Sequence, residues 1–413
     1  MTRLESADVL VVGAGPAGLA VARDLARSGA GSVVVLEREG EPGGIPRHSD
    51  HTGYGLRDLR RSLRGPEYAR RLVDAALGAG AQIRTTAVAT GWAAPDTLEV
   101  TSPRGRVRLQ ARAIVLATGA RERSRSARLI AGDRPPGVLT TGQLQQLVHL
   151  HGRRLQGRAV IVGGELVSWS AVLTLRQAGA SVALMTTEHE AIESYAAFHL
   201  AGRAALRVPV ATRTRVLRIV GRDRVEAVEV ADSRTGATRL LTCEWVVVTG
   251  DWAAESELAR SGGLDIAAGG VPRVDQALAS SAAGVFAIGN LAHPVDTADV
   301  CALDGAHAAE SIARWLRGDA PQAPAVPLLP DATLAWVSPG AVRPQAGPAA
   351  RGQLLAWPRE PRRLATVRIE QAGSVVAVKR LPWPASPGRV LRIPFDLVHR
   401  LDPAGGPATV SLA

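Results

Sequence analysis

Two stretches of the chain, about 150 residues apart, share one order of apolar and polar positions. Residues 7–37 and residues 158–188 each begin with a short β-branched run that ends in glycines. A segment rich in alanine and leucine follows with helical spacing, and a second β-branched run completes the stretch. Each stretch predicts a strand, a glycine turn, a helix and a strand. One βαβ unit is therefore used twice.

Further apolar runs that end in a glycine turn follow each stretch, at residues 111–123 and 243–252. Residues 269–318 then predict a strand, a turn and a helix that do not continue the second stretch, so we expect them to return to the first domain. The expected α/β fold has two Rossmann-like (βαβ) dinucleotide-binding domains, the second inserted in the first. The expected bounds are residues 1–120 and 271–320 for the first domain, 155–262 for the second, and 121–155 for the connection between them.

The last part of the chain predicts a domain of another class. Prolines over residues 319–331 mark a linker. From Thr333 onward, short runs with a period of two alternate with Gly and Pro turns, as in hairpins. We therefore expect a C-terminal all-β domain at residues 333–413, folded as a small sandwich.

Length and composition exclude several classes of protein. The chain of 413 residues, 46% of them hydrophobic, is long enough for two or three domains with their own cores. Cys243 and Cys301 lie far apart, so we expect no disulfide framework and no metal site, and a cytoplasmic location fits this cysteine usage. No apolar run approaches about 18 residues, so no membrane span is expected. The glycines after the apolar start argue against an export signal.

The formal net charge of +11 does not by itself indicate a nucleic-acid partner. Arginines are spread through almost every segment, and neither a basic run nor an aromatic RNA-binding pattern occurs. We therefore expect no nucleic-acid partner. Lys379 is the only lysine, which disfavours Schiff-base and P-loop chemistry.

The first glycine turn has the spacing of a dinucleotide site. Gly13, Gly15 and Gly18 form a G-x-G-x-x-G directly after a predicted strand and at the start of a predicted helix. The first glycine permits the tight turn, the second lets a pyrophosphate approach the backbone, and the third lets the helix pack on the strand. Glu37 ends the next strand, where a carboxylate accepts hydrogen bonds from a ribose. Strand, turn, helix and acidic residue together indicate a bound dinucleotide.

Four segments, "VVGAGPAGLA", "VLE", "ATGAR" and "GVFAIGN", occur in this order in the sequence. The ordered set resembles the FAD-contact motifs of flavoproteins with two dinucleotide-binding domains, the superfamily of pyridine nucleotide-disulphide reductases and thioredoxin reductase. The resemblance covers roughly residues 7–318 and implies FAD as the cofactor. The residues that it assigns to FAD binding are Gly13, Gly15, Pro16, Ala17, Gly18, Glu37, Arg38, Gly44, Val88, Thr118, Gly119, Gly289, Asn290 and Gly305.

Two of these positions carry specific expectations from the resemblance. The superfamily usually has Asp where this chain has Asn290, and Asn keeps an acceptor but loses the charge. A helix starting near Gly305 is expected to direct its N-terminus toward the flavin, where the partial positive charge of the helix stabilises the anionic reduced flavin.

The second glycine turn departs from the fingerprint. Gly163 occupies the tight-turn position, Glu165 the close-approach position and Ser168 the packing position. A carboxylate about 4 Å from a phosphate costs on the order of 4 kcal/mol at an effective dielectric near 20, which disfavours NAD(P) binding. The alternative is a shifted register, in which Gly164 takes the close approach and Glu165 turns outward.

Disulphide reductases of this superfamily need a CxxC beside the flavin, and this chain has none. A [2Fe-2S] site is also excluded, because it needs four suitable ligands. A narrower resemblance is to the flavoprotein subunits of multi-subunit amine and amino-acid oxidases and dehydrogenases. This chain lacks the cysteine-rich segment common in several of them. Glu165 and Trp169 could then line a partner surface or a substrate pocket.

The loop after Glu37 is the richest in polar side chains. In the superfamily this loop passes along the isoalloxazine, so Arg47, His48, His51 and Tyr54 are candidates for the reacting face, and a histidine there is suited to proton transfer. The alternative is that these residues cap the following helix or satisfy buried backbone groups. A second candidate loop carries His293, Asp296 and Asp299, for which the alternative is helix capping.

The sequence thus predicts an FAD-dependent oxidoreductase with Arg47, His48 and His51 as its candidate catalytic residues. Its flavin is expected to oxidise a small organic substrate, or to relay electrons for a partner dehydrogenase subunit, without CxxC chemistry. Two alternatives remain open. One is a self-contained NAD(P)H-dependent flavin reductase, and the other is a non-catalytic FAD-bound subunit that organises an assembly.

Overall fold

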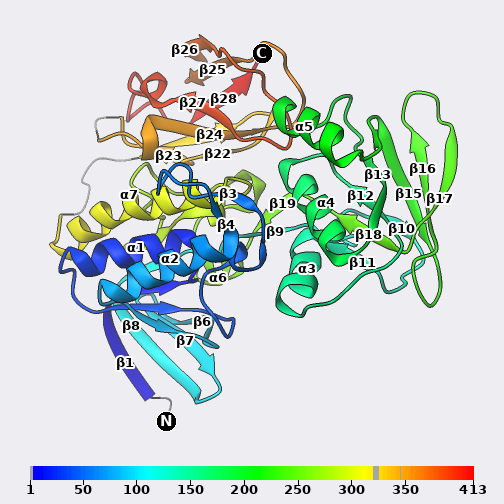
Figure 1. Ribbon diagram of the computed structural model, residues 1–413. Coiled ribbons are helices and arrows are strands. Elements are labelled where there is room, and N and C mark those ends of the chain that lie inside the picture. The colour runs from blue at the N-terminus through cyan, green and yellow to red at the C-terminus, as the bar shows by residue number, and fades with distance from the viewer. Residues whose placement is uncertain (1–2, 320–324, 345) are drawn as a thin grey trace. The chain divides into compact units, whose positions relative to one another are not determined.

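The structure, a computed structural model, describes residues 3–319, 325–344 and 346–413 (Figure 1). The chain forms two compact units. The first contains Met1–Arg47, Thr52–Ala120 and Ala254–Ala413, and the second contains His48–His51 and Arg121–Ala253. The second unit is therefore inserted in the first. Short strands β9 (Ala120–Glu122) and β19 (Trp252–Ala254) lie where the chain passes from one unit to the other.

A seven-stranded sheet forms the centre of the first unit, in the order β5-β2-β1-β8-β7-β6, with β20 also paired to β8. β1 (Arg3–Val12) runs parallel to β2 (Val33–Leu36) and to β8 (Gly105–Leu116). The inner residues of β1 are fully buried, as expected of a parallel strand covered on both faces. The other strands are β5 (Gln82–Arg84), β6 (Val88–Ala94), β7 (Thr97–Ser102) and β20 (Val285–Ala287).

Four helices accompany this sheet: α1 (Pro16–Arg27), α2 (Gly65–Gly78), α6 (Glu257–Ser261) and α7 (Ala298–Leu316). Pro16 starts α1, a position where the missing N–H of proline costs nothing. α1 and α7 lie side by side (Figure 1). The shorter elements are η1 (Ile45–His48), β3 (Thr52–Tyr54), β4 (Leu63–Arg64), η3 (Ala268–Gly270) and η4 (Gly289–Leu291).

The second unit repeats the strand–turn–helix plan around a parallel sheet of order β11-β18-β12-β13-β14. β12 (Arg158–Val162), α4 (Leu166–Ala178) and β13 (Ser181–Thr186) are its βαβ unit. β18 (Trp245–Val248) closes it, and β14 (Val210–Ala211) and α5 (Ala196–Leu206) follow β13. A second sheet contains β10 (Ala131–Gly132), β15 (Thr214–Val220), β16 (Ala227–Asp232) and β17 (Thr238–Thr242).

Residues 121–155 are more than a connection between the domains. They contain β11 (Val138–Thr140), which pairs with β18, and α3 (Thr141–Gln145), which continues into the π turn η2 (Gln146–Leu150). Thr140 and Gln143 form a capping box at the start of α3. The expectation of a connection failed because the strand is only three residues long and has no alternating pattern.

The C-terminal β domain has its own apolar core, which lies between a five-stranded sheet, β23-β21-β28-β25-β26, and a three-stranded sheet, β22-β24-β27. Two sheets around one core are the arrangement expected of a small sandwich. The strands are β21 (Val326–Pro330), β22 (Leu334–Ser338), β23 (Ala341–Val342), β24 (Gln353–Pro358), β25 (Thr366–Gln371), β26 (Ser374–Arg380), β27 (Leu391–Pro394) and β28 (Ala408–Leu412). Short turns η5 (Ala350–Gly352) and η6 (Phe395–Val398) complete it.

The expected linker over 319–331 and the domain bound at residue 320 fall partly on residues 320–324, which lie outside the described residues. The rest of the linker differs from expectation, since Val326–Pro330 forms β21 and buries Val326 and Leu328. Among the described helices, none has both the length and the apolar character needed to cross a membrane.

Candidate cofactor site

The glycine turn of residues 13–18 joins the end of β1 to the start of α1. Gly13 has a φ of +107°, and a Cβ on it would clash with the carbonyl oxygen of Ala117. A Cβ on Gly18 would clash with the carbonyl oxygen of Gly13. Gly15 differs, because a Cβ on it would meet no described atom beyond its chain neighbours within 4 Å. Gly13 and Gly18 thus serve the packing of the chain itself, whereas Gly15 borders open space.

Two other segments reach this turn. Gly44 has a φ of +62°, and a Cβ on it would lie 2.8 Å from the Cα of Gly15. Gly289 has a φ of +64°, and a Cβ on it would lie 2.8 Å from the Cβ of Ala17. The structure therefore brings together Gly15, Ala17, Gly44 and Gly289, which lie far apart in the sequence.

Glu37 lies directly beside the turn. Its Oε2 accepts a hydrogen bond of 3.0 Å from the backbone N–H of Ala14, and its side chain is buried. Its carbonyl accepts the N–H of Ala87 at 2.9 Å, so Val88, the next residue and the start of β6, lies near Glu37. Arg38 is exposed. The acidic residue is thus fixed at the edge of the space that Gly15 borders.

Thr118 and Gly119 follow the end of β8, the parallel neighbour of β1, so they lie at the same sheet edge as the glycine turn. Their positions are held by Glu255. Its carbonyl accepts the Thr118 hydroxyl at 2.7 Å, and its N–H donates to the carbonyl of Gly119 at 2.9 Å.

The helix expected to start near Gly305 starts at Ala298 instead, so that prediction was wrong. Gly305 lies in the middle of α7, where a Cβ would clash with the carbonyl oxygen of Ala17 and lie 2.9 Å from the backbone nitrogen of Val21. The glycine permits the close packing of α7 on α1 and does not start a helix.

Asn290 follows Gly289, and its side chain is held on both sides by one residue. Its Oδ1 accepts the backbone N–H of Asp296, and its Nδ2 donates to the carbonyl of Asp296, each at 3.0 Å. The Asn290 amide, at the position where the superfamily usually has Asp, therefore uses both of its polar atoms to bind the loop before α7.

Residues 7–312 match the family described as pyridine nucleotide-disulphide oxidoreductase. The chain belongs to this family. The family consists of FAD-dependent oxidoreductases, and the chain is an enzyme of that class. Its fold is similar to that of thioredoxin reductases from T. acidophilum (TM-score 0.64, 20% identity, 75% of this chain and 98% of the other) and Lactococcus lactis (TM-score 0.62, 20% identity, 76% and 99%).

Two curated relatives belong to oxidases of more than one subunit. An opine oxidase subunit of Agrobacterium tumefaciens (strain Ach5) is 32% identical over 171 residues, which are 38% of this chain and 32% of that protein. The alpha subunit of sarcosine oxidase from Corynebacterium sp. (strain P-1) is 30% identical over 198 residues, which are 43% of this chain and 19% of that protein. The chain thus spans a third or less of the length of these relatives.

The residues of the first turn fit the FAD of this pyridine nucleotide-disulphide oxidoreductase. Gly15 is the N-cap of α1, and no side chain caps that helix. The N–H groups of its first turn and the helix dipole therefore suit a pyrophosphate, and the open space at Gly15 lets the phosphates approach the backbone. Glu37 places a buried carboxylate directly beside this turn, and a carboxylate is a group that accepts hydrogen bonds from a ribose.

The second turn of the enzyme has no such space. Gly163 has a φ of +126°, and a Cβ on it would clash with Thr249. In this respect it resembles Gly13, on which a Cβ would clash with Ala117. The Glu165 carboxylate is buried and faces the loop after β18, where it accepts hydrogen bonds from the Asp251 N–H and the Trp252 indole N–H, both at 2.9 Å. The alternative in which Glu165 turns outward is wrong, because these two donors hold it inside.

A segment after β13 covers Gly164. A Cβ on Gly164 would clash with the Glu193 carboxylate and lie 2.7 Å from the Ile192 side chain, and the Ser194 N–H donates to the Gly164 carbonyl at 2.9 Å. Glu193 Oε1 accepts the Thr187 hydroxyl at 2.7 Å, while its Oε2 has no hydrogen-bond partner among the described residues.

Burial governs the charges of these two carboxyl groups. It raises the pKa of Glu165 to about 7, although the two donors act in the opposite direction. Burial also raises the pKa of Glu193. The two carboxyl groups at the second turn therefore have a reduced tendency to ionise. The volume of these side chains keeps a ligand away from the turn as much as their charge does.

The boundary between the two units of the chain falls among the candidate catalytic residues, between Arg47 and His48. Arg47 is in the first unit and pairs with Glu39 at 3.3 Å and with Glu41 at 3.1 Å. His48 and His51 belong to the second unit, where His48 is buried and His51 Nε2 lies 3.1 Å from the Ser49 hydroxyl. Tyr54 contacts the ring of Tyr68, with 5.8 Å between centroids.

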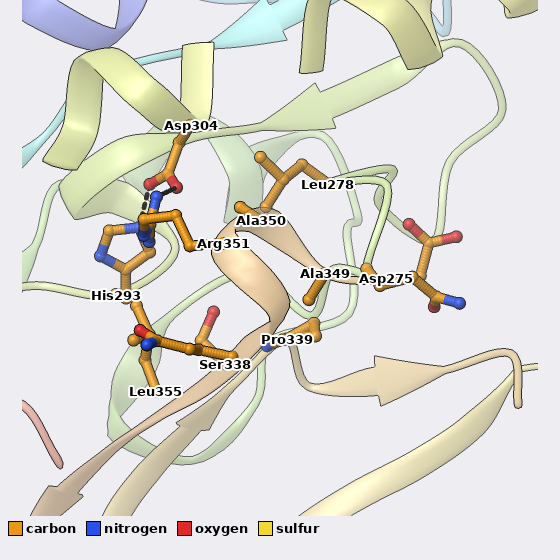
Figure 2. A pocket seen from close by; sticks show the side chains of 12 residues that line it. Asp275, Leu278, His293, Asp304, Ser338, Pro339, Ala349, Ala350, Arg351 and Leu355 are labelled. Carbon is orange, nitrogen blue, oxygen red and sulfur yellow. Dashed lines mark hydrogen bonds and ion pairs between the residues drawn. The ribbon is translucent and has the colours of Figure 1, made fainter. Parts of the chain in front are cut away.

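The second candidate loop is bound to the C-terminal β domain, which the sequence did not connect with the site. His293 is buried and contacts the Asp304 carboxylate, which also accepts a hydrogen bond of 2.6 Å from Arg351 (Figure 2). Against the effect of burial, Asp304 raises the pKa of His293, and the two cationic groups lower that of Asp304. Asp299 lies in the first turn of α7, where it pairs with Arg57 and accepts the N–H of Val300; the N-cap of the helix is Thr297.

Proposed function

We propose that the flavin of this enzyme takes electrons from a small organic donor, or from a partner dehydrogenase subunit, and not from NAD(P)H. The observation that carries the proposal is the contrast between the two turns. A Cβ on Gly15 would meet no described atom beyond its neighbours within 4 Å, whereas Glu165 occupies the same position of the second turn, and Ile192 and Glu193 lie against the adjacent Gly164.

A nicotinamide dinucleotide would have to displace the segment that covers Gly164. That displacement breaks the Ser194–Gly164 backbone hydrogen bond and moves Ile192 and Glu193. Each broken hydrogen bond costs about 1 kcal/mol when water replaces the partner, and a phosphate placed close to an ionised Glu193 costs more. The binding free energy of the dinucleotide is reduced by this sum.

Dithiol chemistry is also outside the proposal. The two cysteines of the chain, Cys243 and Cys301, are both buried and form no disulfide. Burial raises the pKa of Cys243 to about 11 and holds that of Cys301 well above its usual value, so neither thiol is a good nucleophile. Two unpaired buried thiols suit a cytoplasmic enzyme.

The donor class and the partner follow from the relatives. Their names assign them to oxidases of opines and of sarcosine, and both are subunits. We therefore assign this chain a small amine- or amino-acid-type donor and a partner subunit that handles this donor. Neither a nucleic acid nor a membrane is part of the proposal.

We propose the following roles for the chain's residues. The N–H groups at the start of α1 hold the pyrophosphate, Glu37 accepts hydrogen bonds from the ribose, and Gly44, Thr118, Gly119 and Gly289 border the cofactor through their backbones. The N-terminus of α7, at Ala298, favours negative charge near the flavin. When bound, FAD accepts a hydride equivalent from the donor.

Arg47, His48 and His51 remain the proposed residues of the reacting face. His51 is the residue proposed to move a proton, and Ser49 orients its ring. His51→Ala is expected to slow reduction of the flavin by the donor while leaving the FAD content unchanged. Equal rates in the variant and the wild type would remove His51 from the mechanism.

Anaerobic mixing of the purified protein with NADH and with NADPH tests the proposal. We expect the flavin absorption to persist with both, and to bleach with an amine-type donor when the partner subunit is present. Rapid bleaching by either nicotinamide would identify a self-contained reductase. Persistence of the absorption with every donor, in the presence of the partner, would identify a non-catalytic subunit.

A further inference from the structure

The C-terminal β domain reaches the cofactor site through two arginines. Arg392, on β27, donates to both oxygens of the Asp296 carboxylate, at 2.9 and 3.1 Å. The Asp296 side chain is only 3% exposed and that of Arg392 is 24% exposed. Both hydrogen bonds come from Nη2 of Arg392, so one nitrogen bridges the two carboxylate oxygens in a pair that is largely shielded from water.

Asp296 in turn binds and positions Asn290. Its backbone N–H and carbonyl make the two 3.0 Å hydrogen bonds with the Asn290 amide. Its Oδ1 also accepts the N–H of Thr297, the N-cap of α7, at 2.9 Å. Asp296 therefore holds the residue after Gly289 through its backbone and the start of α7 through its carboxylate.

Arg351 makes a second connection, to the body of α7. Besides its 2.6 Å hydrogen bond to Asp304, it lies 3.5 Å from the carbonyl of Val300. Figure 2 shows His293 and Arg351 both reaching the Asp304 carboxylate, beside a small pocket of about 20 Å³ that residues of the β domain also line. Arg351 has a φ of +61°, a conformation uncommon for residues other than glycine, and its contacts hold it there.

We propose that Arg392 and Arg351 are positioning residues for FAD, which fix the segment from Asn290 to Asp304 in the conformation that the cofactor needs. Neither arginine is expected to touch FAD. The C-terminal β domain thereby becomes part of the cofactor site. The inference rests on the proposed function, because it takes Gly289, Asn290 and the start of α7 as the FAD-facing part of this segment.

The residue at position 290 must be Asn to make both hydrogen bonds to Asp296. An Asp at this position could not donate to the Asp296 carbonyl, and its carboxylate oxygen would instead face that carbonyl. Asn290 is thus suited to the arginine-held loop, although the superfamily usually has Asp. Restoring the usual residue is expected to damage the site.

Titration of FAD into deflavinated full-length protein, followed by flavin fluorescence, tests the inference. We expect Arg392→Gln to weaken FAD binding about tenfold or more, within the range of coupling between linked sites, and Arg392→Lys to weaken it less. Asn290→Asp is expected to weaken binding by a similar factor. The double variant should lose less than the product of the two single effects, because both changes act on Asp296. The flavin absorption spectrum of each variant, at saturating FAD, is expected to shift from that of the wild type.

Arg362→Gln is the matched control. Arg362 lies in the same domain and pairs with Glu360 at 3.4 Å, but both side chains are exposed. We expect FAD affinity and spectrum to be unchanged in this variant. Circular dichroism of each apo protein reports whether the chain is folded.

Folded Arg392→Gln protein that binds FAD as the wild type does would overturn the inference. If that variant is unfolded, Asn290→Asp decides, since it leaves the Arg392–Asp296 pair in place, and an unchanged affinity there would overturn the inference equally. A wild-type protein that fails to bind FAD would instead refute the proposed function itself.

Discussion

The two glycine turns of this chain have the same backbone plan and opposite surroundings. In each, a buried parallel strand ends in a glycine at positive φ, and a helix without a side-chain cap follows. At the first turn, Gly15 borders open space. At the second, Glu165 is buried against the loop at Asp251 and Trp252, and Glu193 covers Gly164.

Under the proposed function, the difference means that a nucleotide-binding fold and a nucleotide-binding site are separable. The tight-turn glycine and the helix start serve the fold and are kept in both units. The space above the turn serves the ligand, and in the second unit the chain fills it with its own side chains.

Gly15→Glu is expected to have the largest effect, because it gives the first turn the residue of the second. The side chain would enter the space assigned to the pyrophosphate, and a carboxylate about 4 Å from a phosphate costs on the order of 4 kcal/mol. We expect FAD affinity to fall about a thousandfold in fluorescence titrations of the deflavinated protein.

Gly78→Glu provides the control for this change. Gly78 ends α2 on the surface of the same unit, and a Cβ there also meets no described atom beyond its neighbours within 4 Å. Its FAD affinity should equal that of the wild type. Tight FAD binding by Gly15→Glu would show that the cofactor does not lie at this turn.

Glu165→Gln is expected to change the pH dependence of stability. The pKa of Glu165 is raised from 4.5 to about 7 in the folded protein, so the folded state binds its proton more tightly. This contribution to the free energy of unfolding is fully present below pH 4.5 and lost as the pH rises through about 7, a change of about 3 kcal/mol. Glu165→Gln should remove this loss.

Urea unfolding at pH 5 and pH 8 measures this effect, with exposed Glu226→Gln as the control in the same unit. The wild type and the control should lose stability between the two pH values, and Glu165→Gln should lose less. Equal losses in all three proteins would mean that Glu165 is ionised in the folded protein.

Gly18→Ser gives the packing position of the first turn the residue that the second turn has there, Ser168. Ser168 fits the second turn, where its hydroxyl lies 2.6 Å from that of Thr249. In the first turn a Cβ at residue 18 would clash with the Gly13 carbonyl, and overpacking of this kind costs about 1–3 kcal/mol. Thermal unfolding of the apo protein should show a lower midpoint for Gly18→Ser. Ser168→Gly should shift the midpoint much less, and the opposite order would contradict this comparison.

Glu165→Gly combined with Glu193→Ala is expected to have the smallest effect. The double change removes both carboxylates from the second turn but leaves Ile192 in place. We expect NADH affinity to rise about tenfold, or about 1.4 kcal/mol, as measured by NADH fluorescence. An affinity equal to that of the wild type would mean that other parts of the chain close this turn.

The sequence predicted the features that depend on local spacing. The glycine fingerprint, the acidic Glu37 and the insertion of one Rossmann-like domain in the other follow from periodicity and turn residues. The start of α7 was misplaced because Gly305, a glycine required by contact with α1, resembles a turn glycine in sequence. β11 was missed because its pairing with β18 joins residues about 100 positions apart, which no local pattern records.

The side-chain partners of the site were the least predictable feature. Glu165 was expected to face a phosphate or solvent, and its direction depends on donors at Asp251 and Trp252, more than 80 residues away. Arg351 and Arg392, which form ion pairs with α7 and its preceding loop, belong to a domain without any chemical motif. A charged residue in a β domain carries no sequence signal that it supports a distant cofactor site.

Isothermal titration of the deflavinated protein, first with FAD and then with NADH and NADPH, tests most directly whether one turn is open and the other closed. We predict tight binding of one FAD per chain, followed by no further heat of binding from either nicotinamide dinucleotide. A second dinucleotide bound with comparable affinity, or no binding of FAD, would contradict this assignment.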